Sequence, residues 1–439
     1  MSGFIPHVRE IITNINYRRP DYISANSSSN KSSRDPSMDL AQTQSKTSSK
    51  YAQGIPDALS FDNIINGGTC PPTTVREFMK YLECVERAPE NLQFFLWFRD
   101  YTLRFEEYKP SDPFSTPPAT ATSENKAFGS SEYQNDSAVR FCDGAEEERP
   151  INKMKSIMDF PPQFIAPWET DFDKEGSSLV EVPSAQTSYR MIAEKTFDRA
   201  GIKIPDPDLP YRDEIDRIIA IYIADDGSRQ LNLSSRQRTS LLERVSTTTH
   251  PTAFQPILET VEYSLRHQAH PNFIRWSICN GNKPRQIFAK CLGVILITSG
   301  CLYAILTTLS NMSRGWRAFS AIFWVLGIST LYAALQGMCV VLHGLHHRHL
   351  RPWELWESEE SAMYLDDKSN SGKYEDYPWI KKYEKRFIIR KIFDREVWVQ
   401  EPALRQIQDI IFLQALLIGL GAAAIFTVIF LAVPGGDFF

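Results

Sequence analysis

The chain has 439 residues, of which 42% are hydrophobic, and a formal net charge of −5 at pH 7. This length allows two or three domains, and the weak negative charge argues against nucleic acid as a partner. The seven cysteines form no CxxC pair and no regular framework, so we expect reduced thiols.

Residues 1–54 are expected to be a disordered N-terminal segment. The stretch 24–50 is rich in Ser and Asn and has almost no large apolar residue. Such a stretch buries too little apolar surface to offset the entropy lost on ordering. The first residues also lack the apolar core of a signal peptide, so we expect no cleavable signal.

Residues 55–280 are expected to form an all-α domain. Apolar residues repeat at helical spacing over Val75–Tyr108, and Pro89 suits the first turn of a new helix. This pattern predicts two helices with a break near Arg87–Ala88. Tyr211–Ala224 is strongly amphipathic, and no segment of any length alternates as a strand would.

A Pro/Ser/Thr-rich insertion at about 110–200 interrupts this domain and is expected to be largely disordered. Its last part, Thr187–Ala200, has the pattern of one helix that ends at Gly201. Helical segments resume after it, so the insertion does not mark a domain boundary.

Three apolar stretches in the last third predict transmembrane helices at 287–310, 318–343 and 410–434. Each contains an uncharged run of the roughly 20 residues that a helix needs to cross a hydrocarbon core about 30 Å thick. No ionisable residue lies in the middle of a span, which argues against an ion pathway. The expected fold class is all-α: a helical bundle plus three transmembrane helices.

The distribution of Lys and Arg predicts the orientation of this anchor. Basic residues precede the first span and are numerous in the 344–409 loop, whereas the segment after the third span has none. Because cytosolic loops carry this excess, we expect the N-terminus and the 344–409 loop in the cytosol and the C-terminus outside.

The 344–409 loop interleaves aromatic and basic residues. Within it, KKYEKRFIIRK at 381–391 predicts an amphipathic basic helix. Such a helix either lies on the anionic lipid surface or packs against the soluble domain, and the sequence leaves both readings open.

Three motifs follow one another along the helical domain: PENLQFFLWF at 89–98, LNLSSRQR at 231–238 and HPNFIRWS at 270–277. Their order resembles the regulator of G-protein signalling (RGS) domain, in which a Glu-Asn-Leu element precedes an Asn-Leu/Ile-Asp-Ser element and a final Arg-bearing helix. The resemblance covers roughly 59–277. An RGS-like helical bundle followed by three spanning helices also looks like fungal membrane-anchored RGS proteins, some of which are linked to cell polarity and bud-site marking.

The resemblance implies a negative regulator of heterotrimeric G-protein signalling at the plasma membrane. RGS domains brace the switch loops of a Gα subunit and thereby accelerate GTP hydrolysis, so the chain would be a GTPase activator, with no active site and no cofactor of its own. By motif, Glu90 and Asn91 fall on the first Gα contact, and Asn232 approaches the Gα glutamine. An amide offers a donor and an acceptor without adding charge to a site filled with phosphate.

The third motif departs from the family pattern, because Gln268 or Ala269 replaces the Asp and Asn272 replaces the Arg. Gln268 and Asn272 therefore complete the expected Gα surface without its charges. This loss favours an alternative function, a membrane polarity landmark or scaffold that binds partners without activating a GTPase. Asn91 and Asn232 also have a simpler reading as helix caps.

Histidines at the end of the second span give a competing reading. His343, His346 and His347 form an HxxHH box, which is typical of membrane di-iron oxygenases. Those enzymes use three such boxes, whereas this chain has no histidine after His349. We therefore expect no metal site, and the box suits a segment that faces anionic headgroups.

Overall fold

The computed structural model describes residues 19–20, 22–23, 55–107, 185–225, 227–356 and 378–436. Most of the expected disordered segments, 1–54 and 110–200, lie outside these residues. The described chain divides into two compact units. We call Met79–His270 the helical unit, and the residues up to Phe78 together with those from Pro271 onward the membrane unit.

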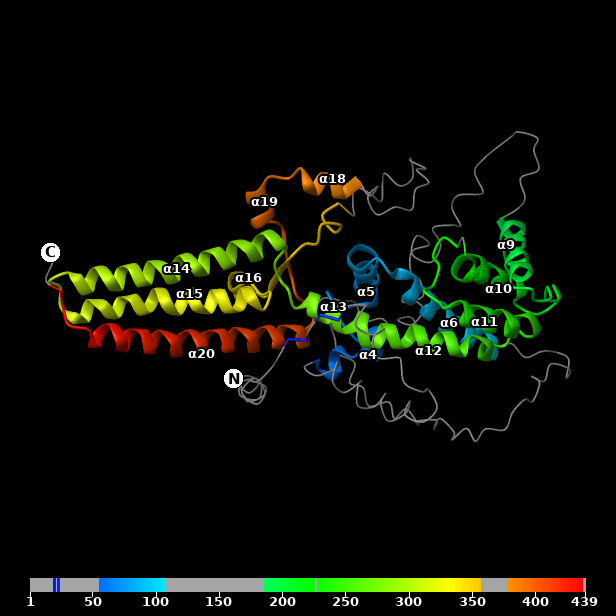
Figure 1. The fold of residues 1–439 in the computed structure, drawn as a ribbon, viewed down its shortest axis with the longest axis horizontal. Helices are drawn as coiled ribbons and strands as arrows, with labels where there is room; N and C mark the ends of the chain where they lie inside the picture. Colours follow the sequence, from blue (N-terminus) through cyan, green and yellow to red (C-terminus); the bar gives the residue numbers. More distant parts are fainter. Residues whose placement is uncertain are drawn as a thin grey trace, which may run out of the picture. The chain divides into compact units, whose positions relative to one another are not determined.

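The helical unit is built from α-helices (Figure 1). They are α6 (Pro89–Glu107), α9 (Ala185–Arg199), α10 (Arg212–Ile218), α11 (Ser235–Thr247) and α12 (Gln255–Ser264), with α5 (Val75–Tyr81) leading in. Three π-helical segments continue α5, α10 and α12, namely Leu82–Glu86, Ile219–Ile223 and Leu265–Ala269. The expected break is confirmed, since Arg87 adopts the left-handed conformation at φ 58° just before α6.

An aromatic core holds the helical unit together. Trp97 stacks on Tyr101 with ring centroids 5.2 Å apart, and both rings contact Phe254. The Trp97 indole N–H donates to Glu214 at 2.7 Å, and Arg104 binds the same carboxylate through two hydrogen bonds. Aromatic burial therefore joins α6 to the segments that follow the insertion.

The membrane unit contains the longest helices, α14 (Lys283–Leu309) and α20 (Pro402–Ala432), with α15 (Ser320–Leu335) between them (Figure 1). Its shorter helices are α4 (Phe61–Ile65), α13 (His270–Ser277), α16 (Val340–Gly344), α18 (Pro378–Glu384) and α19 (Ile388–Ile392). Within the described part of the chain, three helical segments are long and apolar enough to cross a membrane: Lys283–Leu309, Arg314–Leu335 and Pro402–Ala432.

The second span ends earlier than the expected 318–343, because α15 stops at Leu335. Gly337 has a φ of 86°, a conformation that glycine adopts without strain and that ends a helix. Arg19 donates a hydrogen bond to the carbonyl of Gln336 at 2.5 Å, so a partner from the N-terminal segment satisfies that end. The apolar composition continues to Leu342, and its last residues belong to the separate helix α16 (Val340–Gly344).

A small β-ladder also departs from the all-α expectation. Strands β1 (His347–His349) and β2 (Glu396–Trp398) pair antiparallel, with Arg348 opposite Val397. Strands of three residues are too short to show an alternating pattern. Their pairing depends on a partner far away in sequence, which composition does not reveal.

Candidate functional site

The first candidate surface lies in the helical unit, where the first turn of α6 meets the loop before α11. Arg229 in this loop interacts electrostatically with Glu90 and bonds the Tyr222 hydroxyl. Burial raises the pKa of Glu90, and the Arg229 guanidinium opposes this shift. Tyr222, whose carbonyl accepts from the Leu231 N–H, packs against Phe94 of α6 with ring centroids 5.9 Å apart, so the loop of Asn232 and the first half of α6 share Tyr222 as a neighbour.

The loop before α11 has a defined conformation. Its Leu231 is buried, and the Leu231 N–H donates to the Tyr222 carbonyl at 2.9 Å. Ser234 caps α11 through a reciprocal capping box with Gln237. Asn232 lies between these anchors with an exposed side chain. It is thus held at the surface by its neighbours.

The reading of Asn91 and Asn232 as helix caps is wrong. The helix α6 begins at Pro89, so Asn91 already lies inside its first turn. Ser234, not Asn232, caps α11. Neither asparagine therefore has the capping role that commonly explains an Asn near a helix start.

The two residues taken from the third motif differ in burial and belong to different units. Gln268 is half-buried in the π-helical segment Leu265–Ala269 of the helical unit. Asn272 belongs to the membrane unit and is only 1% exposed. Its amide donates to the Ile23 carbonyl and accepts from the Ile23 N–H, both at 2.9 Å. Asn272 therefore holds the N-terminal segment against α13 and is not accessible to a partner.

No protein-family model, no curated protein and no solved structure matches this chain. The evidence for the helical architecture and for the three apolar helices is therefore the structure alone. The RGS resemblance continues to rest on the three motifs.

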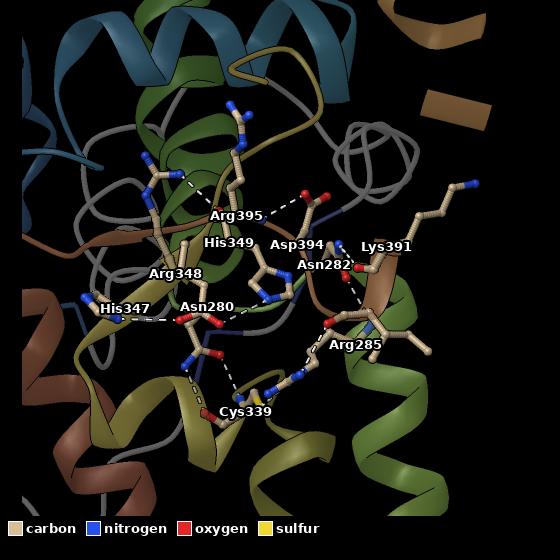
Figure 2. Close-up of polar contacts among 12 residues, drawn as sticks. Asn280, Asn282, Arg285, Cys339, His347, Arg348, His349, Lys391, Asp394 and Arg395 are labelled. Atoms are coloured by element: carbon tan, nitrogen blue, oxygen red, sulfur yellow. Dashed lines mark hydrogen bonds and ion pairs between the residues drawn. The ribbon is translucent and has the colours of Figure 1, made fainter. Parts of the chain in front are cut away.

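Hydrogen bonds connect several segments of the membrane unit at a polar junction around Asn280 and Asn282 (Figure 2). Asn280 donates to the Cys339 carbonyl at 3.0 Å and accepts from the Cys339 N–H at 2.7 Å. The Asn280 carbonyl accepts from the His349 N–H at 2.8 Å, and Asn282 donates to the Lys391 carbonyl at 2.5 Å. One short linker thus fixes the starts of α14 and α16 and the ends of β1 and α19.

Charged side chains beside this junction are buried and paired. Arg348 binds Glu354 through two hydrogen bonds of 2.8 Å, and the Arg351 N–H also donates to that carboxylate at 2.6 Å. The Arg351 guanidinium lies 3.6 Å from the centroid of the Trp276 ring. Burial, with the Glu354 charge adding to it, raises the pKa of Glu77 to about 7. These contacts position the backbone, and nothing in them points to a reaction.

The histidine box is divided between two environments. His343 lies on α16 with its Nε2 3.3 Å from Asp409 of α20. His346 completes a group with these two residues, in which one ligand atom from each lies within 4.8 Å of the others. His347 is in β1 and its Nδ1 lies 3.6 Å from Glu396. Sequence reasoning missed Asp409, because nothing in the sequence relates it to a box more than 60 residues earlier.

The basic stretch at 381–391 is not one helix. It divides into α18 and α19, and Arg386 between them binds Asp394 through two 3.0 Å hydrogen bonds. α19 packs beside the start of α14, where Phe393 contacts Phe288 edge to face. Phe387, Ile388 and Ile389 around it are more than half exposed. An apolar cluster therefore faces outward next to the first span.

Cys70 is disulfide-bonded, so the expectation of reduced thiols is wrong at this position. Cys84, Cys279, Cys291, Cys301 and Cys339 are free. Cys70 lies before the first span, and its N–H donates to the Glu401 carboxylate at 2.7 Å.

Proposed function

We propose that the chain is a membrane-tethered negative regulator of heterotrimeric G-protein signalling that binds a Gα subunit and accelerates its GTP hydrolysis. One observation carries this proposal: Tyr222 packs against Phe94 of α6 and holds the Asn232 loop at Leu231, and the charge of Arg229 in that loop acts on Glu90. These are the two segments in which RGS-type motifs were identified. Their juxtaposition makes one contact surface from two distant parts of the sequence.

The chemistry of this surface suits a bracing role. Asn232 presents an exposed amide from a loop that is fixed at Leu231 and at the Ser234 cap. A pre-ordered donor and acceptor can hold a Gα switch loop in its reactive geometry with little entropy loss on binding. The Gα subunit's own residues then carry out the hydrolysis, so the chain needs no active site or cofactor.

The membrane anchor supports the same function, because Gα subunits act at a membrane surface. The exposed apolar residues around α19 are accompanied by Arg390 and Lys391. Aromatic and aliphatic side chains next to basic ones are typical of segments that rest in the lipid interface. We propose that α19 makes this contact on the cytosolic leaflet of the plasma membrane.

A second function, a polarity landmark or scaffold that binds partners without activating a GTPase, is favoured by the third motif. Asn272 is buried against Ile23, and Gln268 lacks the charge of the family's Asp. Without the charged residues of the third motif we expect the chain to dock more weakly on Gα, while its fold is retained.

The deciding experiment is single-turnover GTP hydrolysis by candidate Gα subunits with the full chain in lipid nanodiscs. We expect faster hydrolysis with the wild type, and a loss of about tenfold or more in this stimulation for Asn232→Ala. Asn311→Ala, an exposed asparagine between the first two spans, is the matched control and should behave as the wild type.

Binding separates the two functions. If Gα in its transition-state form binds the chain but hydrolysis is not accelerated, the scaffold function is correct. If no tested Gα binds and none is stimulated, the RGS-type function is wrong.

A further inference from the structure

We propose that His343, His346 and Asp409 form a binding site for one divalent transition-metal ion, with zinc as the best-suited ion. Nothing in the proposed G-protein function requires this site. It lies in the membrane unit, where α16 meets α20, and it would connect the end of the second span to the start of the third.

The distances fit a small metal ion. Zinc lies about 2.0–2.2 Å from its nitrogen and oxygen ligands, and tetrahedral geometry then places neighbouring ligand atoms about 3.3 Å apart. The His343 Nε2 and the Asp409 Oδ1 are 3.3 Å apart. One ligand atom of His346 lies within 4.8 Å of both, so this side chain needs only a small rotation to complete the site.

The two histidines are positioned in different ways. His343 is on the short helix α16, is 5% exposed overall, and has its ring 5.2 Å from that of Phe412 on α20. His346 follows the end of this helix in a left-handed conformation with a φ of 52°, and its N–H donates to the His343 carbonyl at 2.8 Å. This turn places two imidazoles on the same side of the chain, facing Asp409.

Hydrogen bonding does not fully account for this cluster. The Nδ1 atoms of His343 and His346 are buried and have no hydrogen-bond partner among the described residues. Such atoms are uncommon, because burying an unpaired polar group costs about 1–3 kcal/mol. An ion held by the His343 Nε2 and the Asp409 carboxylate leaves the His343 Nδ1 as it is, so of these two atoms the His346 Nδ1 is the one that such an ion can take as a ligand.

The ligand set determines the class of ion. Two imidazoles and one carboxylate match the preferences of zinc and neighbouring transition metals, whereas calcium and magnesium prefer oxygen ligands only. Three protein ligands leave at least one position open for water or another small ligand. His346 and Asp409 are partly exposed, which leaves a route by which an ion can enter.

The adjacent histidines provide an internal control. The His347 Nδ1 lies 3.6 Å and the His349 Nε2 3.9 Å from the carboxylate of Glu396 on β2. The metal-binding group is thus not the contiguous HxxHH box but two of its histidines and a carboxylate from another helix. This replaces the expectation of no metal site with a specific set of three residues.

The test uses the full chain in detergent micelles, stripped with a chelator and titrated with Co²⁺ and then Zn²⁺. We expect one equivalent of Co²⁺ to bind with visible absorption bands of low-coordinate cobalt, Zn²⁺ to displace it, and the thermal midpoint to rise on binding. Asp409→Asn and His346→Asn should lower the affinity at least about tenfold. Asparagine also tolerates the left-handed conformation at position 346. His347→Gln should bind as the wild type.

Several results would overturn the site. They are the absence of saturable binding near one equivalent, binding that survives Asp409→Asn unchanged, and an equal loss with His347→Gln. Thermal midpoints of the stripped proteins show whether each variant folds. If His346→Asn does not fold, the nearly isosteric Asp409→Asn decides alone. If neither folds, Co²⁺ titration of the wild type decides, because the absence of saturable binding near one equivalent, or visible bands of six-coordinate cobalt only, overturns the site.

Discussion

At the scale of single residues, buried charges in the membrane unit have the clearest consequences. Glu77 on α5 lies near Glu354, and the guanidinium groups of Arg348 and Arg351 compensate only part of its burial. His349 is 2% exposed, and burial together with the Arg285 charge lowers its pKa to about 4. His349 is therefore neutral near pH 7, whereas Glu77 titrates there.

Glu77 makes the stability of the membrane unit depend on pH. Its pKa is about 7 in the folded chain against an ordinary value of 4.5, so the folded state binds the proton more tightly. Stability from this group is fully present below about pH 4.5 and is lost as the pH rises through 7. One pKa unit corresponds to about 1.4 kcal/mol, so the full loss is at most about 3.5 kcal/mol.

We therefore expect Glu77→Gln to stabilise the chain at pH 8 and to have much less effect at pH 5. Thermal unfolding in detergent at the two pH values measures the difference. The exposed Glu243→Gln on α11 serves as the control. An equal effect of Glu77→Gln at both pH values would show that the carboxyl does not titrate in this range.

At the scale of helices, glycines determine how closely the spans pack. A Cβ on Gly327 of α15 would lie 2.9 Å from the backbone nitrogen of Ile297 on α14, and one on Gly293 would lie 3.0 Å from the Gly327 carbonyl oxygen. Gly419 of α20 similarly approaches the Val325 carbonyl of α15 at 3.0 Å. Small residues at these positions allow direct backbone contact between neighbouring helices.

We expect Gly327→Val to separate α14 from α15 and to destabilise the chain by about 1–3 kcal/mol. The contact atoms are backbone, so they cannot move aside as a flexible side chain would. Gly421→Val on α20 is the matched control, because a Cβ there meets nothing within 4 Å. Thermal unfolding in micelles should show a lower midpoint for the first variant only, and equal midpoints would mean that the two helices are not in close contact.

At the scale of the whole molecule, two features bear on which side of the membrane the helical unit occupies. The excess of Lys and Arg in the 344–409 loop predicts a cytosolic location. The disulfide at Cys70 is typical of an oxidising compartment instead. Both features lie on the same side if three helices span the membrane, so a single topology experiment decides between them.

We expect the native sequons before the first span, at Asn26, Asn30, Asn135 and Asn232, to remain unglycosylated in cells, and a sequon-bearing tag fused after Phe439 to be glycosylated. Digestion with an N-glycosidase, followed by gel mobility, measures both. A glycan at Asn26 or Asn232 would place the helical unit outside the cytosol. That result would also exclude an intracellular Gα as its partner.

The residues within single segments determined the three membrane spans and the start of α6. The three spans follow from runs of apolar residues, because crossing a membrane depends on the length and hydropathy of one segment. The start of α6 follows from Pro89, because its fixed backbone angle and missing N–H suit a first helical turn. The assignment of Glu90, Asn91 and Asn232 to a Gα surface rests on the RGS resemblance and stays a prediction.

Tertiary structure decided the features that depend on residues distant in sequence. The second span ends at Leu335 because Gly337 turns the chain and Arg19 satisfies the last carbonyl. Asn272 is buried because it binds Ile23. His343 and His346 acquire a carboxylate partner only when α20 packs beside α16. Such contacts arise from packing between segments, and the pattern of residues within one segment does not encode them.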